Sequence, residues 1–153
     1  MKNFLFLVIF ISSSNIFSQV ENEEELYKNA LIYIYVLNGD EISSILDKDI
    51  KEDLLGRKDL LTYCQSKIYN IFRRLVDVFP QSDRFIEYCY ELAHYSNCQD
   101  EQIEYNQKFL ELQQEGSYRK RESLMGLAFI FLERKDVEKA NKYFSEMLLQ
   151  KPP

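Results

Sequence analysis

The side chains suited to acid–base or metal chemistry are few and scattered. The chain has one histidine, His94, and Tyr90 precedes it by one helical turn. It has no HExxH motif, no glycine-rich phosphate loop and no GxSxG elbow, the patterns on which several hydrolase and nucleotide-binding sites are built. Its 25 acidic residues are spread along the chain as in solvated helix faces. We therefore predict a non-catalytic protein with no cofactor and no metal site.

The three cysteines are the remaining reactive groups. Cys64 and Cys98 lie at equal distances in sequence from Gln81, so an antiparallel hairpin turning there would place them at the same height. In an exported chain, where disulfides persist, this predicts a Cys64–Cys98 bridge. Three separate thiols are the other interpretation, with Cys89 packed as a small hydrophobe. The cysteine spacings match no zinc-finger pattern.

Helices have to position these groups, because apolar residues recur at helical spacing and no strand alternation competes with them. Only 4 Gly and 3 Pro occur in 153 residues, so no flexible linker marks a second domain. We expect Asn22, Asp40, Ser82, Asp100 and Asp136 to begin helices, and Asn38-Gly39, Pro80, Gly116 and Pro152 to end them. Residues 47–57 are densely charged and expected to be partly irregular. The predicted class is all-α, with helices over 22–37, 40–46, 59–79, 83–96, 100–115, 119–134 and 137–150.

The last predicted helix pair has the clearest packing pattern. Small residues, Ala128 and Ala140, stand where the two helix axes would come closest, at the usual 8–10 Å between packed helices. Larger apolar residues surround that contact on both helices. The expected packing residues of this pair are Leu124, Leu127, Ala128 and Phe131, followed by Ala140, Phe144 and Met147.

The same pattern occurs earlier in the chain. A shift that places Glu87 on Glu122 also places Leu92 on Leu127, Ala93 on Ala128 and Phe109 on Phe144. This order of small and large residues resembles the tetratricopeptide (TPR) repeat, a unit of about 34 residues. The clearest repeats are 86–119 and 121–153, with a degenerate one at about 49–82. The earlier copy departs from the pattern at Tyr105 and Ser96, which stand where the later copy has Ala140 and Phe131.

The resemblance implies antiparallel helix pairs stacked as a short superhelix, with a compact helical bundle as the alternative. It also implies a groove lined by the first helix of each repeat. The corresponding residues mix acids with aromatic and apolar groups, which favours a peptide segment that carries Lys or Arg beside an apolar anchor. In the other interpretation, Met125 and Phe129 pack under a neighbouring helix and the acids are solvated. The predicted groove residues are Glu87, Tyr90, Glu91, His94, Asn97, Glu122, Met125, Phe129 and Glu133.

The first 18 residues resemble a secretory signal peptide. Lys2 gives a positive start, residues 4–11 form an unbroken apolar run, and Ser18 is a small residue suited to cleavage before Gln19. A membrane anchor is the alternative, but a spanning helix needs about 20 apolar residues. Cleavage leaves a single domain over 19–153 and, by removing Lys2, changes the net charge from −6 to −7. This acidic balance disfavours nucleic acid and anionic lipid as partners and mildly favours a basic one.

Together these patterns predict an exported protein- or peptide-binding module, in the periplasm of a bacterial cell envelope or outside the cell. A structural or self-assembling envelope component is the alternative. It is motivated by the end of the sequence at Pro152-Pro153, where a further helix usually covers the last repeat. An uncovered last helix pair would favour self-association through that end.

Overall fold

The computed structural model describes residues 22–39, 41–42, 45, 47–113 and 118–150. Over these ranges the chain forms seven α-helices and no strand, which confirms the all-α prediction. The predicted signal peptide, most of the predicted helix 40–46, and the predicted helix ends at Gly116 and Pro152 lie outside the described residues. The helices are α1 (Glu23–Leu37), α2 (Lys48–Leu54), α3 (Leu60–Val78), α4 (Phe85–Tyr95), α5 (Gln99–Leu112), α6 (Tyr118–Glu133) and α7 (Val137–Leu149).

Two of the predicted helix starts are formed by side-chain caps. The Asn22 side chain accepts a hydrogen bond from the Glu24 amide at 3.1 Å, and the Asp136 carboxylate accepts one from the Lys139 amide at 3.2 Å. Each bond satisfies one of the free amides in the first turn of a helix. Gly39 follows α1 with a φ of 95°, a conformation that glycine adopts without strain.

Two other predicted starts are displaced by two residues each. Ser82 does not cap a helix beginning at 83, because α4 begins at Phe85; instead its hydroxyl accepts from the Arg84 amide at 3.0 Å in the preceding turn. Asp100 lies inside the first turn of α5, whose N-cap residue is Cys98. An acidic side chain in that turn still interacts favourably with the helix dipole.

The charged segment 47–57 was expected to be partly irregular, and residues 55–57 do lie outside any helix. Its larger part forms α2, a helix that the sequence did not predict. Asp47 caps the helix by accepting from the Ile50 amide at 3.0 Å. The helix buries Leu54 completely, and Asp53 next to it pairs with Arg57 at 2.6 Å and accepts from the Tyr63 hydroxyl of α3. One buried leucine and one shared carboxylate therefore anchor a helix whose other residues are mostly polar.

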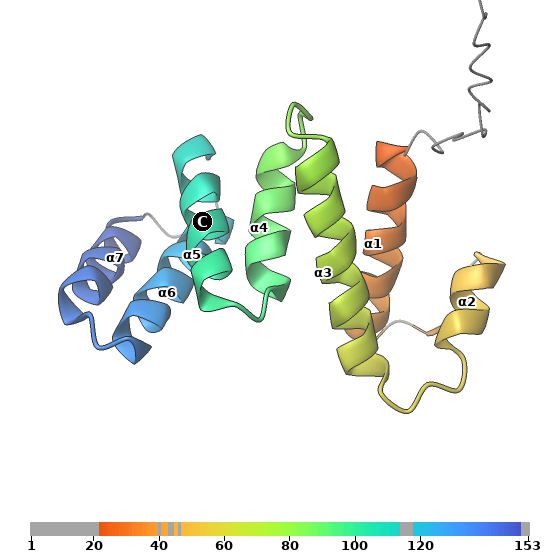
Figure 1. The fold of residues 1–153 in the computed structure, drawn as a ribbon. Coiled ribbons are helices and arrows are strands. Elements are labelled where there is room, and N and C mark those ends of the chain that lie inside the picture. The colour runs from red at the N-terminus through yellow and green to blue at the C-terminus, as the bar shows by residue number, and fades with distance from the viewer. Residues whose placement is uncertain (1–21, 40, 43–44, 46, 114–117, 151–153) are drawn as a thin grey trace, which may run out of the picture.

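Apart from α2, the helices lie side by side in chain order (Figure 1). Each packs on the helix before it and the helix after it: α1 on α3, α3 on α4, α4 on α5, α5 on α6 and α6 on α7. Consecutive helices joined by short turns run in opposite directions. Within the described residues, no helix is long and apolar enough to cross a membrane.

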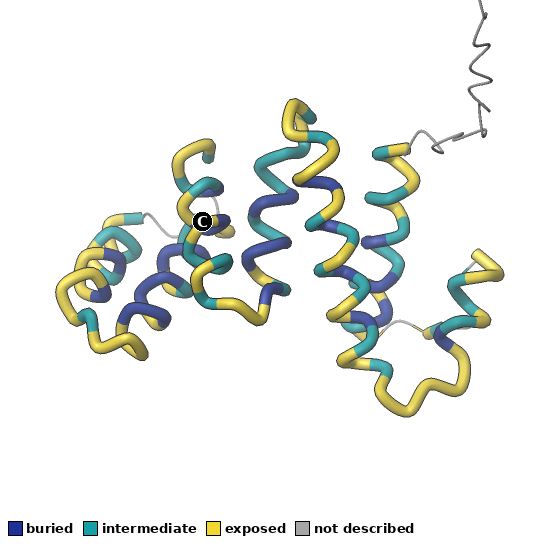
Figure 2. The backbone as a smooth tube through the Cα atoms, in the orientation of Figure 1, coloured by how far each residue is buried: buried dark blue, intermediate teal, exposed yellow. Residues whose placement is uncertain are grey.

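The core follows this row of helices as two clusters of buried side chains (Figure 2). The first extends from α1 to α5 and contains Phe72 and Tyr88, both fully buried. The second joins α6 to α7 around Ala128 and Ala140, which are also buried, as is Ala93 in the first cluster. Small side chains at these positions let the helix backbones approach closely. The expected packing residues that complete these clusters are buried at Leu92, Phe109, Leu124, Leu127 and Phe131, and partly buried at Phe144 and Met147.

Candidate functional site

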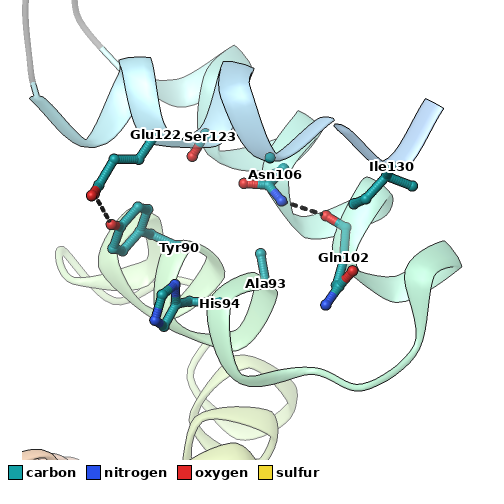
Figure 3. A pocket seen from close by; sticks show the side chains of 9 residues that line it. Tyr90, Ala93, His94, Gln102, Asn106, Glu122, Ser123 and Ile130 are labelled. Atoms are coloured by element: carbon teal, nitrogen blue, oxygen red, sulfur yellow. Dashed lines mark hydrogen bonds between the residues drawn. The ribbon is translucent and has the colours of Figure 1, made fainter. Parts of the chain in front are cut away.

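A small cleft of about 200 Å³ opens where α4, α5 and α6 meet. Figure 3 shows α4 contributing one wall and α6 the facing wall, with side chains of α5 between them. The volume exceeds the roughly 30 Å³ of one water and falls below the 300–1,000 Å³ typical of cofactor pockets. It therefore suits a group about the size of one side chain. The lining residues are Tyr90, Ala93, His94, Gln102, Asn106, Glu122, Ser123, Gly126 and Ile130.

Small residues keep this space open. Ala93 lines the cleft from α4, and Ser123 and Gly126 line it from α6, so short side chains border the space on both helices. A Cβ added to Gly126 would meet no atom within 4 Å. The residue therefore borders empty space and is not held against a packed neighbour.

Acidic groups and one arginine surround the mouth of the cleft. The Arg119 guanidinium pairs with Glu87 at 3.3 Å and with Glu91 at 3.5 Å, and its central carbon lies 4.9 Å from the centroid of the Tyr90 ring. The Tyr90 hydroxyl donates to the Glu122 carboxylate at 2.5 Å. Glu87 and Glu91 thus share one cation, while Glu122 is bonded to a neutral phenol, which leaves these three carboxylates with an excess of negative charge.

Burial shifts two pKa values in this group. Desolvation raises the pKa of Glu91 to about 7, against the opposing effect of Arg119 and with further increases from Glu87 and Glu122. Burial also raises the pKa of Tyr90, as does the hydrogen bond to Glu122. The Tyr90 phenol therefore keeps its proton and remains a donor to Glu122 at neutral pH.

The polar side chains of α5 at the cleft are bonded to nearby backbone. The Asn106 Nδ2 group donates to the Gln102 carbonyl at 2.8 Å, and the Gln102 Nε2 group donates to the Ser96 carbonyl at 2.6 Å (Figure 3 draws the first). These bonds direct both amide groups and leave their side-chain oxygens as acceptors.

Ser123 differs from these residues. Its side-chain oxygen is buried and has no hydrogen-bond partner within the part of the chain that the structure describes; the residue is 3% exposed and lines the cleft. A buried hydroxyl without a partner costs about 1–3 kcal/mol, so it requires an explanation.

The structure brings four of the predicted groove residues together at the cleft mouth: Glu87, Tyr90, Glu91 and Glu122. His94 lines the same cleft from α4 and remains exposed, with its ring 6.4 Å from that of Tyr90 and nearly parallel to it. These five side chains supply the acidic and aromatic part of the predicted groove.

The other predicted groove residues lie outside the cleft. Met125 and Phe129 are 42% and 51% exposed on the adjacent face of α6, where the Phe129 ring packs edge-on against Phe144 at 5.6 Å. Glu133, also exposed, accepts from Gln99 at 2.7 Å. Asn97 follows α4 and lines a separate hollow against α3. Met125 and Phe129 are thus solvent-accessible, and a helix does not cover them.

Sequence reasoning missed several residues at this site: Arg119, Gln102, Asn106 and Ser123. A signal existed for Asn106, which is a polar residue between the apolar Tyr105 and Phe109 on the buried side of its helix. Another existed for Arg119, which begins the basic run Arg119-Lys120-Arg121 about one turn before Glu122. For Ser123 no signal existed in the sequence, because the hydrogen bonding of its hydroxyl depends on which side chains the fold brings near it.

The Cys64–Cys98 disulfide expected from the sequence is not formed. All three cysteines are free thiols, with Cys64 buried and Cys98 exposed. Thr62, Ser66 and Tyr69 of α3 face the segment that contains Cys98. Cys64 points about half a turn away from them around the helix axis. The prediction placed the two residues at a common height but did not consider the direction in which each side chain points.

Comparisons with protein-family models, with curated proteins and with solved structures gave no match to this chain. The likeness to TPR repeats stays a prediction from the sequence, and functional reasoning depends on the described geometry.

Proposed function

We propose that the protein is a non-catalytic interaction module that binds a protein or peptide along the faces of α4 and α6. The observation that carries this proposal is a cleft lined by Glu122, with exposed apolar side chains next to it on the same helix. Met125 and Phe129 are accessible, and Glu122 precedes them on the same helix by about one and two turns. Apolar anchors beside charged groups are the usual composition of a binding surface.

The net charge supports a basic partner. The chain carries a formal charge of −6; at the cleft mouth Glu87 and Glu91 share Arg119, and Glu122 is bonded to the Tyr90 hydroxyl. Complementary charge raises the association rate and selects among partners. We therefore expect bound segments to combine a basic residue with a large apolar one.

Selection from a random peptide library tests this function. The protein should enrich peptides that contain both residue types, and the double variant Met125→Ala/Phe129→Ala should bind the selected peptides about tenfold or more weakly. Both positions are exposed, so the helical circular dichroism should remain unchanged. The matched control is Leu148→Ala/Leu149→Ala, which removes exposed apolar groups from α7 and should leave binding intact. Failure to enrich any peptide, or equal binding by both double variants, would contradict the proposal.

We also propose that the protein is exported through residues 1–18, on the strength of the charged start, apolar run and small residue before Gln19. Expression of the full chain in a bacterium followed by N-terminal sequencing of the exported fraction tests this. A mature chain beginning near Gln19 is the expected result. Retention of Met1 in a cytosolic product would contradict it.

Self-association is a second candidate function, favoured by the apolar end of α7. Leu148 and Leu149 are 75% and 81% exposed there, and Val137 at the start of the helix is also exposed. Light scattering across a range of concentrations should show association that Leu148→Ser weakens. A monomer at every concentration would exclude it.

A further inference from the structure

The unpartnered hydroxyl of Ser123 is the starting point. It is buried, faces the cleft from α6, and lies next to Glu122, which lines the same cleft. Folded proteins rarely leave a buried hydroxyl without a hydrogen bond. In a cleft large enough for a side chain, a bound group is one way for this bond to be completed.

The charge that a bound group would carry follows from Glu122. Among the described residues, no cation lies within 4 Å of its carboxylate; the Tyr90 and Tyr118 hydroxyls are its hydrogen-bonding partners. Glu87 and Glu91, by contrast, share Arg119. A phenol donates a hydrogen bond but brings no positive charge, so among the described residues no ion pair balances the charge of the Glu122 carboxylate.

The remaining lining groups are acceptors of the same kind. The side-chain oxygens of Asn106 and Gln102 lie on the α5 side, while their amide nitrogens are engaged with backbone carbonyls. A ligand with several donors, a positive charge and no acceptor matches this set. A lysine ammonium has three donors and no acceptor.

Geometry favours an ammonium over a guanidinium. Arginine binds a carboxylate best through two parallel hydrogen bonds, one to each oxygen. Glu122 already accepts at Oε2 from Tyr90 at 2.5 Å, which obstructs that arrangement. An ammonium is a compact charge that needs only one carboxylate oxygen, and its slender methylene chain fits a cleft of about 200 Å³.

We propose, building on the protein-binding function above, that this cleft receives the side chain of a lysine from a bound polypeptide. The ammonium donates to the Glu122 carboxylate and the Ser123 hydroxyl, with an amide oxygen of α5 as the third acceptor. The exposed Met125 and Phe129 then contact apolar residues that flank the lysine.

Nuclear magnetic resonance titration with N-acetyl-lysine N-methylamide tests the cleft directly. The probe should shift the Ser123 backbone amide and the Asn106 and Gln102 side-chain amides in a saturable way. The norleucine counterpart, which has the same methylene chain without the ammonium, should not. The arginine counterpart should bind more weakly than lysine. Equal shifts with norleucine, or tighter binding of arginine, would overturn the proposal.

Three variants identify the groups involved. Glu122→Gln should weaken the probe about tenfold or more, because a hydrogen bond between charged groups is lost, and Ser123→Ala about threefold or more. Gly126→Leu should abolish binding by filling the cleft, and the open space around Gly126 allows the protein to fold. The control Glu138→Gln removes one exposed charge from α7 and should change nothing. Wild-type affinity in Glu122→Gln would refute the assignment.

Failure of the lysine cleft and failure of the protein-binding function give different results. If the selected peptides bind Gly126→Leu as well as the wild type, the lysine cleft is wrong and the protein-binding function stands. If the lysine probe saturates the cleft while no peptide is enriched, the cleft stands and the protein-binding function is wrong.

Discussion

Glu91 should make the protein less stable as the pH rises through neutrality. Its side chain is only 14% exposed and lies beside Glu87 with Arg119 as its cation partner. Burial raises its pKa from an ordinary value of 4.5 to about 7. At about 1.4 kcal/mol for each pH unit, this difference corresponds to about 3 kcal/mol of unfolding free energy. The substitution Glu91→Gln removes the titration and keeps the size of the side chain.

The sign follows from proton binding. Between pH 4.5 and about 7 the folded state holds a proton on Glu91 that the unfolded state has lost. The folded state therefore binds more protons in this window, and the free energy of unfolding falls as the pH rises. The contribution is complete below pH 4.5 and lost above about 7. Glutamine stays neutral throughout, so Glu91→Gln should match the wild type near pH 4.5 and exceed its stability by up to about 3 kcal/mol at pH 8.

Urea unfolding followed by circular dichroism at 222 nm, at several pH values from 4.5 to 8, measures this difference. Carboxylates with lowered pKa values, such as Glu23 and Asp53, titrate in both proteins and cancel from the comparison. Glu138→Gln is the control, because it makes the same substitution at an exposed carboxylate of α7. Parallel stability curves for Glu91→Gln and the wild type, or a less stable Glu91→Gln at pH 8, would refute the reasoning.

Three further predictions concern the fold. Ala128→Phe should overpack the fully buried contact between α6 and α7 and lower the unfolding free energy by about 1–3 kcal/mol; an unchanged urea midpoint would show that the helices are not closely packed there. Asn22→Ala should cost about 1 kcal/mol by removing the cap of α1, measured in the same assay. In the native protein, maleimide should label Cys98 rapidly, and Cys64 and Cys89 only after unfolding, because burial protects both thiols and raises their pKa values. Equal labelling rates would contradict the burial.

The helices were predictable because their signals are local. Asn22 and Asp136 cap the helices they were expected to cap, and Ala93 and Ala128 are buried where small residues were expected. The helix α2 was missed because only Ile50 and Leu54 pack it on the core, and of the two only Leu54 is fully buried. Two apolar residues are too few to establish a periodic pattern, so the surrounding charge dominated the interpretation.

The acidic side of the cleft was predictable for the same reason, because Tyr90 and Glu122 occupy matching faces of two similar helices. The direction in which each side chain points between neighbouring helices was not predictable from the sequence. Cys64 and Cys98 illustrate this, since their heights along the helices gave no information about the faces on which they lie. Contacts between α5 and α6 had no sequence signal either, so the polar groups of α5 were not assigned to the site.

Gly126 shows why the cleft itself depends on the three-dimensional structure. Within a helix, glycine is about 1 kcal/mol less favourable than alanine, so in sequence this residue is only a weak point in α6. In the structure, packing does not require it, since an added Cβ would meet no atom within 4 Å. Ser123 lowers the stability of the folded protein separately, because its buried hydroxyl has no hydrogen-bond partner among the described residues that line the same cleft. Gly126 and Ser123 border the same space, and each lowers the stability of the folded protein. Two such residues are not expected at an interface that serves only to pack helices together. They are expected of a site whose contacts are completed by a ligand.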